Sequence, residues 1–85
     1  MVRTDTRATW KCVVWVGPDG QAGNGQWRRG NELAYDEQWC AQMDALYPGW
    51  THSIAQRIGR PPQQSPVGWE LHPLFGNMES PPMQL

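Results

Sequence analysis

The chain has 85 residues and a formal net charge of −1 at neutral pH, so it should form one small domain with a modest core. A charge this close to zero argues against electrostatic binding of bulk nucleic acid, which normally needs a clearly basic face. The sequence shows no apolar run long enough to span a bilayer and no signal peptide, and we therefore expect a cytoplasmic protein without membrane contact.

Six tryptophans are an unusual number for a chain of this length, which has a single phenylalanine. Each tryptophan can bury roughly 200 Å² of surface. We expect most of them to form the core and one or two to remain exposed as anchors for a partner.

The clearest predicted strand covers residues 9–16 (TWKCVVWV), which are rich in β-branched and aromatic side chains. Its even-numbered residues face one way, and the odd-numbered ones, including Val13 and Trp15, face the other. Because both faces carry large apolar side chains, the strand should be central or covered on both sides.

Residues 17–25 (GPDGQAGNG) hold two turn dipeptides and are expected to form a connection. Their glycine spacing matches no phosphate-binding loop. Residues 26–30 (QWRRG) then read as a short second strand at a sheet edge, with Trp27 and Arg29 on one face and Arg28 on the other.

A helix is predicted over residues 36–47 (DEQWCAQMDALY), with Asp36 as its N-cap and the turn of Pro48 and Gly49 at its end. Helical spacing gives this segment one apolar stripe and one polar face. The predicted stripe comprises Trp39, Cys40, Met43, Leu46 and Tyr47. The polar face includes Glu37, Gln38, Gln42 and Asp44.

Residues 50–58 (WTHSIAQRI) fit a strand and a helix almost equally well, because Trp50, Ile54 and Ile58 share a face in either conformation. We favour the strand, since a third strand would make the small sheet self-sufficient. The resulting fold is α+β: a three-stranded, mainly antiparallel sheet in the order strand, strand, helix, strand, with the helix packed on one face.

Six prolines in the last part of the chain exclude regular helix or strand there. We therefore divide the chain into a small α+β domain, residues 1–60, and a proline-rich extended tail, residues 61–85. An apolar cluster within residues 67–75 is expected to pack on the domain, with the tail wrapping the sheet face opposite the helix. The alternative is that this cluster docks on a partner.

No catalytic or metal-binding motif is recognisable, and neither an enzyme activity nor a cofactor is expected. His52 and His72 lack neighbours at zinc-ligand spacing, and Cys12 and Cys40 are expected to be buried thiols. A nucleophile formed by Cys40 and His52 is disfavoured, because burial would raise the pKa of the thiol.

The sequence favours a non-enzymatic protein-binding module that acts on a host or cellular protein by steric occupation. Arginine outnumbers lysine six to one, which suggests a GC-rich genome and, with the small size, a bacteriophage or mobile-element accessory protein that inhibits or redirects a host protein. The alternative is a small nucleic-acid-binding protein that uses Trp27, Arg28 and Arg29. The candidate partner-binding residues are Trp27, Arg28, Arg29, Trp69, Phe75, Glu37 and Asp44.

Overall fold

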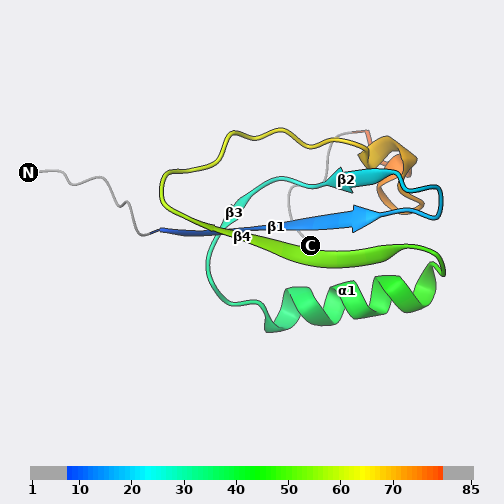
Figure 1. Ribbon diagram of the computed structural model, residues 1–85, viewed down its shortest axis with the longest axis horizontal. Coiled ribbons are helices and arrows are strands. Elements are labelled where there is room, and N and C mark those ends of the chain that lie inside the picture. Colours follow the sequence, from blue (N-terminus) through cyan, green and yellow to red (C-terminus); the bar gives the residue numbers. More distant parts are fainter. Residues whose placement is uncertain (1–7, 80–85) are drawn as a thin grey trace, which may run out of the picture.

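The computed structural model describes residues 8–79, so the ends of the predicted domain and tail, residues 1–7 and 80–85, lie outside it. A four-stranded antiparallel sheet and one helix confirm the predicted α+β fold (Figure 1). The elements in chain order are β1 (Thr9–Val16), β2 (Ala22–Asn24), β3 (Arg28–Arg29), α1 (Ala34–Leu46) and β4 (Thr51–Ile58), followed by single 3₁₀ turns at Trp69–Leu71 and Phe75–Asn77.

Strand β1 is the centre of the sheet. β4 pairs with one edge of it along the full length, from Thr9 opposite Ile58 to Val16 opposite Thr51. β2 and β3 pair with its other edge, one after the other. The ambiguous segment after the helix is therefore a strand, as favoured, and it pairs with β1 over the whole length of that strand.

The expected connection, residues 17–25, is shorter than the sequence suggests, because β2 lies inside it. Trp15 lies opposite Gly23 and Lys11 opposite Arg28, so the outer chain has one residue more than β1 over this stretch. That extra residue is a β-bulge, which separates β2 from β3. The sequence of β2, AGN, has low strand propensity, so β2 could not be predicted from composition and is defined by its pairing with β1.

The helix begins at Ala34, with Leu33 at the cap position and no side-chain capping bond, so the prediction of Asp36 as N-cap is wrong. Asp36 is instead 1% exposed, and its Oδ2 accepts from Lys11 Nζ at 2.7 Å and from Arg28 Nη2 at 3.0 Å. The ion pairs with Lys11 and Arg28 stabilise the Asp36 carboxylate more than a single capping bond would, because a buried carboxylate requires charged partners. The ion pairs fix the start of α1 against β1 and β3.

The inward face of α1 is also rotated from the predicted stripe. Cys40 is buried, whereas Leu46 is 61% exposed, so placing Leu46 in the core was wrong. Asp36, Cys40 and Asp44 lie at successive i, i+4 positions on the inward side, and Asp44 bonds to His52 of β4. The apolar pattern misled because two of these three inward residues are carboxylates.

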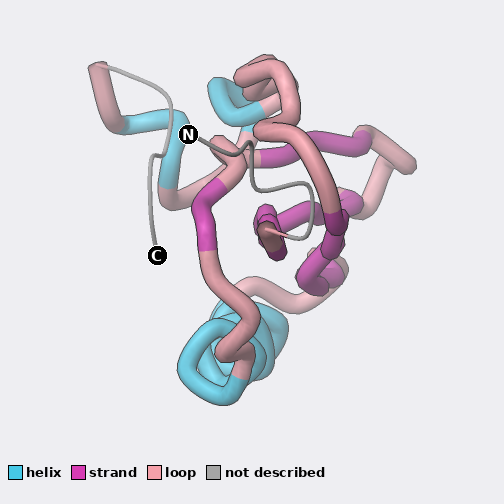
Figure 2. Tube along the Cα trace, turned by 90° about the vertical axis from the view of Figure 1, so that its left-hand side faces the viewer, coloured by secondary structure: helices cyan, strands magenta, loops and turns pink. Residues whose placement is uncertain are grey.

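The core lies between the sheet and α1 (Figure 2) and is closed by the last described part of the chain. After β4 the chain turns round the end of the sheet and runs back beside β2 (Figure 1). The Phe75 ring lies 5.1 Å from that of Trp15 and 5.9 Å from that of Trp39. The first part of the tail thus follows the β2/β3 edge and borders the face opposite α1, where Gln63 and Val67 line a pocket, and its last described part joins the helix-side core.

Candidate functional site

The three adjacent residues predicted as an anchor on β3 do not act as one clamp. Arg28 is directed to Asp36 and is held in that ion pair. The Cζ atom of Arg57 lies over the Trp27 ring, 5.1 Å from the centroid of that ring, which is a cation–π arrangement. Arg29 is exposed. The structure therefore separates Trp27 from Arg28 and pairs Trp27 with Arg57, a residue of β4 that sequence reasoning did not select.

The four remaining candidates have different environments. Phe75 is 2% exposed and lies in the core, so it offers no surface to a partner and its selection as a contact residue was wrong. Trp69 is half-buried against the same core. Glu37 is exposed on α1, and Asp44 is committed to His52.

The buried histidines form a chain of hydrogen bonds with Asp44. The Nε2 atoms of His52 and His72 lie 2.8 Å apart, and His52 Nδ1 lies 2.7 Å from Asp44 Oδ1. His72 Nδ1 accepts from the backbone N–H of Leu74 at 3.0 Å and of Phe75 at 3.4 Å. The chain of bonds connects the tail, β4 and α1.

These contacts determine the proton on each ring. Because His72 Nδ1 accepts, His72 carries its proton on Nε2 and donates it to His52. His52 Nε2 is then the acceptor, so the proton of His52 is on Nδ1, where it is donated to Asp44. Burial and the neighbouring His52 lower the pKa of His72 from 6.5 to about 4. His72 is therefore neutral at neutral pH and acts as a hydrogen-bond donor to His52.

Neither cysteine has the environment of a nucleophile. Burial, together with the carboxylates of Asp44, Asp36 and Glu37, raises the pKa of Cys40 to about 11. Burial also raises the pKa of Cys12, although hydrogen bonds oppose it, and Cys12 Sγ lies 3.1 Å from the carbonyl oxygen of Gly25. Both are free thiols. Within residues 8–79, no His, Cys, Asp and Glu side chains form a group of three suited to hold a metal ion.

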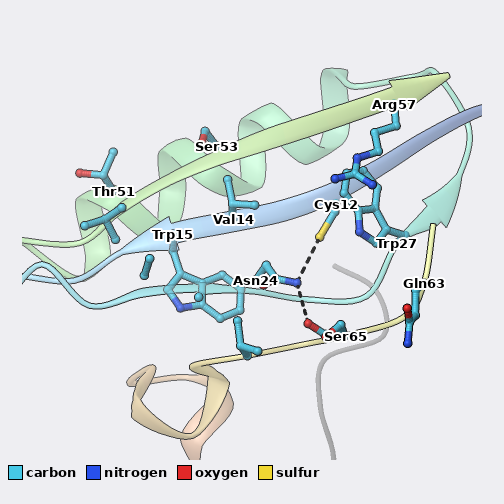
Figure 3. Close-up of a pocket in the computed structure, with 14 residues that line it drawn as sticks. Cys12, Val14, Trp15, Asn24, Trp27, Thr51, Ser53, Arg57, Gln63 and Ser65 are labelled. Carbon is cyan, nitrogen blue, oxygen red and sulfur yellow. Dashed lines mark hydrogen bonds between the residues drawn. The ribbon is translucent and has the colours of Figure 1, made fainter.

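The sheet face opposite α1 carries a pocket of about 570 Å³ (Figure 3). β1 contributes Val14 and Val16 to it, and Val67 of the tail forms part of its rim. Val16 and Val67 are 46% and 52% exposed. Asn24 Nδ2 donates to Ser65 O at 3.4 Å and so joins the tail to β2 at this rim. The pocket is an apolar hollow between the sheet and the returning tail.

Polar side chains surround this apolar floor. Thr51 and Ser53 of β4 line one side, Gln63 of the tail lines another, and the stacked pair of Trp27 and Arg57 lies at one end (Figure 3). Among the residues of 8–79 that line it, Arg57 is the one with a charged side chain. Apolar surface bordered by a few polar groups is typical of sites that bind apolar groups.

A second groove, of about 420 Å³, lies between α1 and β4. Its helix wall includes Leu33, Glu37 and Ala41, and its strand wall includes Ile54 and Gln56. Two of the predicted contact residues, Glu37 and Asp44, thus belong to this groove rather than to the face with Trp27.

The chain matches no protein-family model, no curated protein and no solved structure. No helix within the described residues is long and apolar enough to cross a membrane.

Sequence reasoning missed Arg57 as part of a site, and it selected Asp44 without foreseeing its contact with His52. Alternation along residues 51–58 places Arg57 on the same face as Ser53, and this was the available signal for its position over the pocket. No spacing rule connects His52 with His72, because the turn of the tail brings them together.

Proposed function

We propose that this chain is a non-enzymatic protein-binding module that receives apolar side chains of a cytoplasmic host protein in the pocket on its free sheet face. The observation that carries the proposal is the apolar surface of that hollow, with half-buried Val14 and exposed Val16 on its floor and exposed Val67 at its rim. Exposed apolar surface bordered by polar residues marks interaction sites on small proteins. As a phage or mobile-element accessory protein, it would act by occupying a surface that the host protein uses.

Protein contact explains this surface better than nucleic-acid contact does. A nucleic-acid site needs several free cations, whereas Arg28 is neutralised by Asp36 and Arg57 is stacked on Trp27. Aromatic and arginine side chains placed together are also typical energetic centres of protein interfaces. The pair of Trp27 and Arg57 is therefore the expected polar border of the contact.

An affinity capture from bacterial lysate tests the proposal through variants of the pocket. Val14→Arg places a charge on the apolar floor, and Gln42→Arg adds the same charge on the outer face of α1, where Gln42 is exposed. The wild type and Gln42→Arg should retain the same protein, and Val14→Arg should lose it. Thermal melting of each variant checks that the fold is intact, and Val67→Arg, at a side chain already 52% exposed, repeats the test at the rim.

Two results would contradict the proposal. Retention of the same protein by both pocket variants would place the contact elsewhere. Retention of DNA or RNA that falls steeply with salt, in place of protein, would favour the nucleic-acid alternative.

A further inference from the structure

We propose that β4 and the groove beside it bind an extended, basic segment of a partner protein, which adds to the sheet as a further strand. The inference rests on the proposed function, because it specifies the kind of protein segment that is bound. Three features carry it: the direction of the backbone groups of β4, the groove between β4 and α1, and the acidic groups on the wall of that groove.

Alternate residues of β4 direct their backbone groups away from β1. The amide of Gly59 donates to Ala8 O, so the odd-numbered positions face β1. The amide of His52 donates outward, to Asp44 Oδ1 at 2.7 Å. The same alternation directs the amides and carbonyls of Ile54, Gln56 and Ile58 outward.

No strand pairs with this edge of β4 within residues 8–79. β4 is also paired without interruption on its inner side, with every residue from Thr51 to Ile58 opposite one of β1. Ile58, at its end, is 76% exposed. A regular strand edge with free donors and acceptors is a template for strand addition by an extended peptide.

The groove makes the edge selective for certain side chains. An added strand would direct every second side chain into the space between β4 and α1, where Leu33, Ala41 and Ile54 provide apolar walls. Glu37 and Asp44 place carboxylates at the same groove, and the Asp44 side chain is 39% exposed. Lysine and arginine suit this combination, because their aliphatic stems lie on apolar surface while their charged ends reach the carboxylates.

The experiment uses the full chain and a synthetic heptapeptide that alternates valine and lysine. Amide hydrogen exchange, followed residue by residue by NMR, measures which β4 amides the peptide protects. Strand addition predicts that protection increases at Ile54, Gln56 and Ile58 and stays unchanged at Ala55 and Arg57, which already face β1. A heptapeptide that alternates valine and glutamate is the charge control and should give no protection.

Two pairs of variants measure separately how the outward backbone amide and the groove charge contribute to peptide binding. Gln56→Pro removes an outward amide and should weaken peptide binding by about fivefold, whereas Gln56→Ala keeps that amide and should bind as the wild type does. Glu37→Lys reverses a groove charge and should weaken binding by about fivefold or more, and Glu37→Gln by less. Circular dichroism verifies that each variant is folded.

The possible outcomes distinguish this inference from the proposed function. Absence of protection on β4 with the lysine peptide at millimolar concentration overturns the β4 inference, and so does equal binding of the lysine and glutamate peptides. Resonance shifts confined to Val14, Val16 and Trp27 would also overturn it while supporting the pocket as the site. Alternating protection that Gln56→Pro removes would support strand addition even if Val14→Arg leaves lysate capture unchanged.

Discussion

The two edges of the sheet end in opposite ways. At the β2/β3 edge, the tail supplies partners: the Gln64 side-chain amide bonds both to Trp27 N and to Trp27 O at 2.9 Å, and Asn24 N donates to Val67 O at 2.9 Å. At the β4 edge, Asp44 occupies one amide, that of His52. One edge is therefore completed by the chain itself, and the other has no strand partner within residues 8–79.

The described part of the tail covers only one of the two sheet edges. Exposed edges invite unwanted pairing, and small proteins usually cover or charge them. Here the proline-rich tail covers the edge that the bulge had already interrupted, and the more regular edge is the one left open. An uninterrupted strand edge in a chain of this size is consistent with the binding role proposed for β4.

The largest expected effect comes from releasing the tail from the closed edge. Phe75→Ala should lower the free energy of unfolding by about 3–5 kcal/mol, because it removes a buried ring that packs on Trp15 and Trp39. Urea unfolding followed by tryptophan fluorescence measures the loss. Val67→Ala, in the same tail but 52% exposed, is the control and should change little. Equal effects of the two variants would mean that the tail is not anchored through the core.

Acid should loosen the same anchor. His72 has a pKa of about 4 in the fold, against an ordinary value of 6.5, so between these values the unfolded chain binds the extra proton. Stability is then complete above pH 6.5, falls as the pH drops towards 4 and levels off below it, with a loss on the order of 3 kcal/mol from this group. The groups facing His72 include His52, bonded to Asp44, and the Tyr47 ring.

Urea unfolding at a series of pH values checks this dependence. His72→Gln should be less stable at neutral pH and should lose most of the slope between pH 4 and 6.5. The same slope in the variant would assign the acid sensitivity to another group.

A smaller effect is expected where the tail bonds to Trp27, the residue before β3. Gln64→Ala removes both bonds to the Trp27 backbone and should cost about 1 kcal/mol, since these bonds are exposed to solvent. Hydrogen exchange at the Trp27 amide should accelerate in the variant. Gln63→Ala, one residue earlier, is the matched control. An unchanged exchange rate at Trp27 would show that water replaces the side chain without cost.

The smallest effect on stability belongs to the open edge. Gln56→Pro should change the free energy of unfolding by about 0.5 kcal/mol or less, because its amide faces away from β1. Ala55→Pro should cost about 3 kcal/mol, because the amide of Ala55 pairs with Cys12 of β1. Chemical denaturation of the two variants compares them directly. Similar losses would contradict the assignment of outward and inward amides on β4.

The sequence predicted those parts of the fold that have a strong local pattern. The alternation in residues 9–16 located β1, and the helical spacing located α1 to within two residues at its start. The expectation that a short hairpin needs a third strand for stability correctly predicted β4. The prediction of β1 succeeded because side-chain period and burial agree there, whereas the spacing in α1 located the helix but not its inward face.

The sequence could not predict features that arise from contact between distant segments. β2 has no apolar pattern of its own and exists because β1 pairs with it. Asp36 and Asp44 look like surface residues on a helix, yet each faces the sheet because a cation or a histidine from another element meets it. Both grooves likewise depend on how the tail and α1 pass the sheet, which no residue spacing encodes.

The position of Phe75 and His72 also constrains how the chain can fold. Trp15 lies in the first strand, and the rings that enclose it come from the last described turns. β1 and β4 can pair before that, but the core remains open until the far segment arrives. Contacts between such distant parts of a chain must overcome loop closure before they contribute stability, which slows folding. A folding intermediate that lacks the tail would therefore expose Trp15, and its fluorescence would report the closing of the core as the final step.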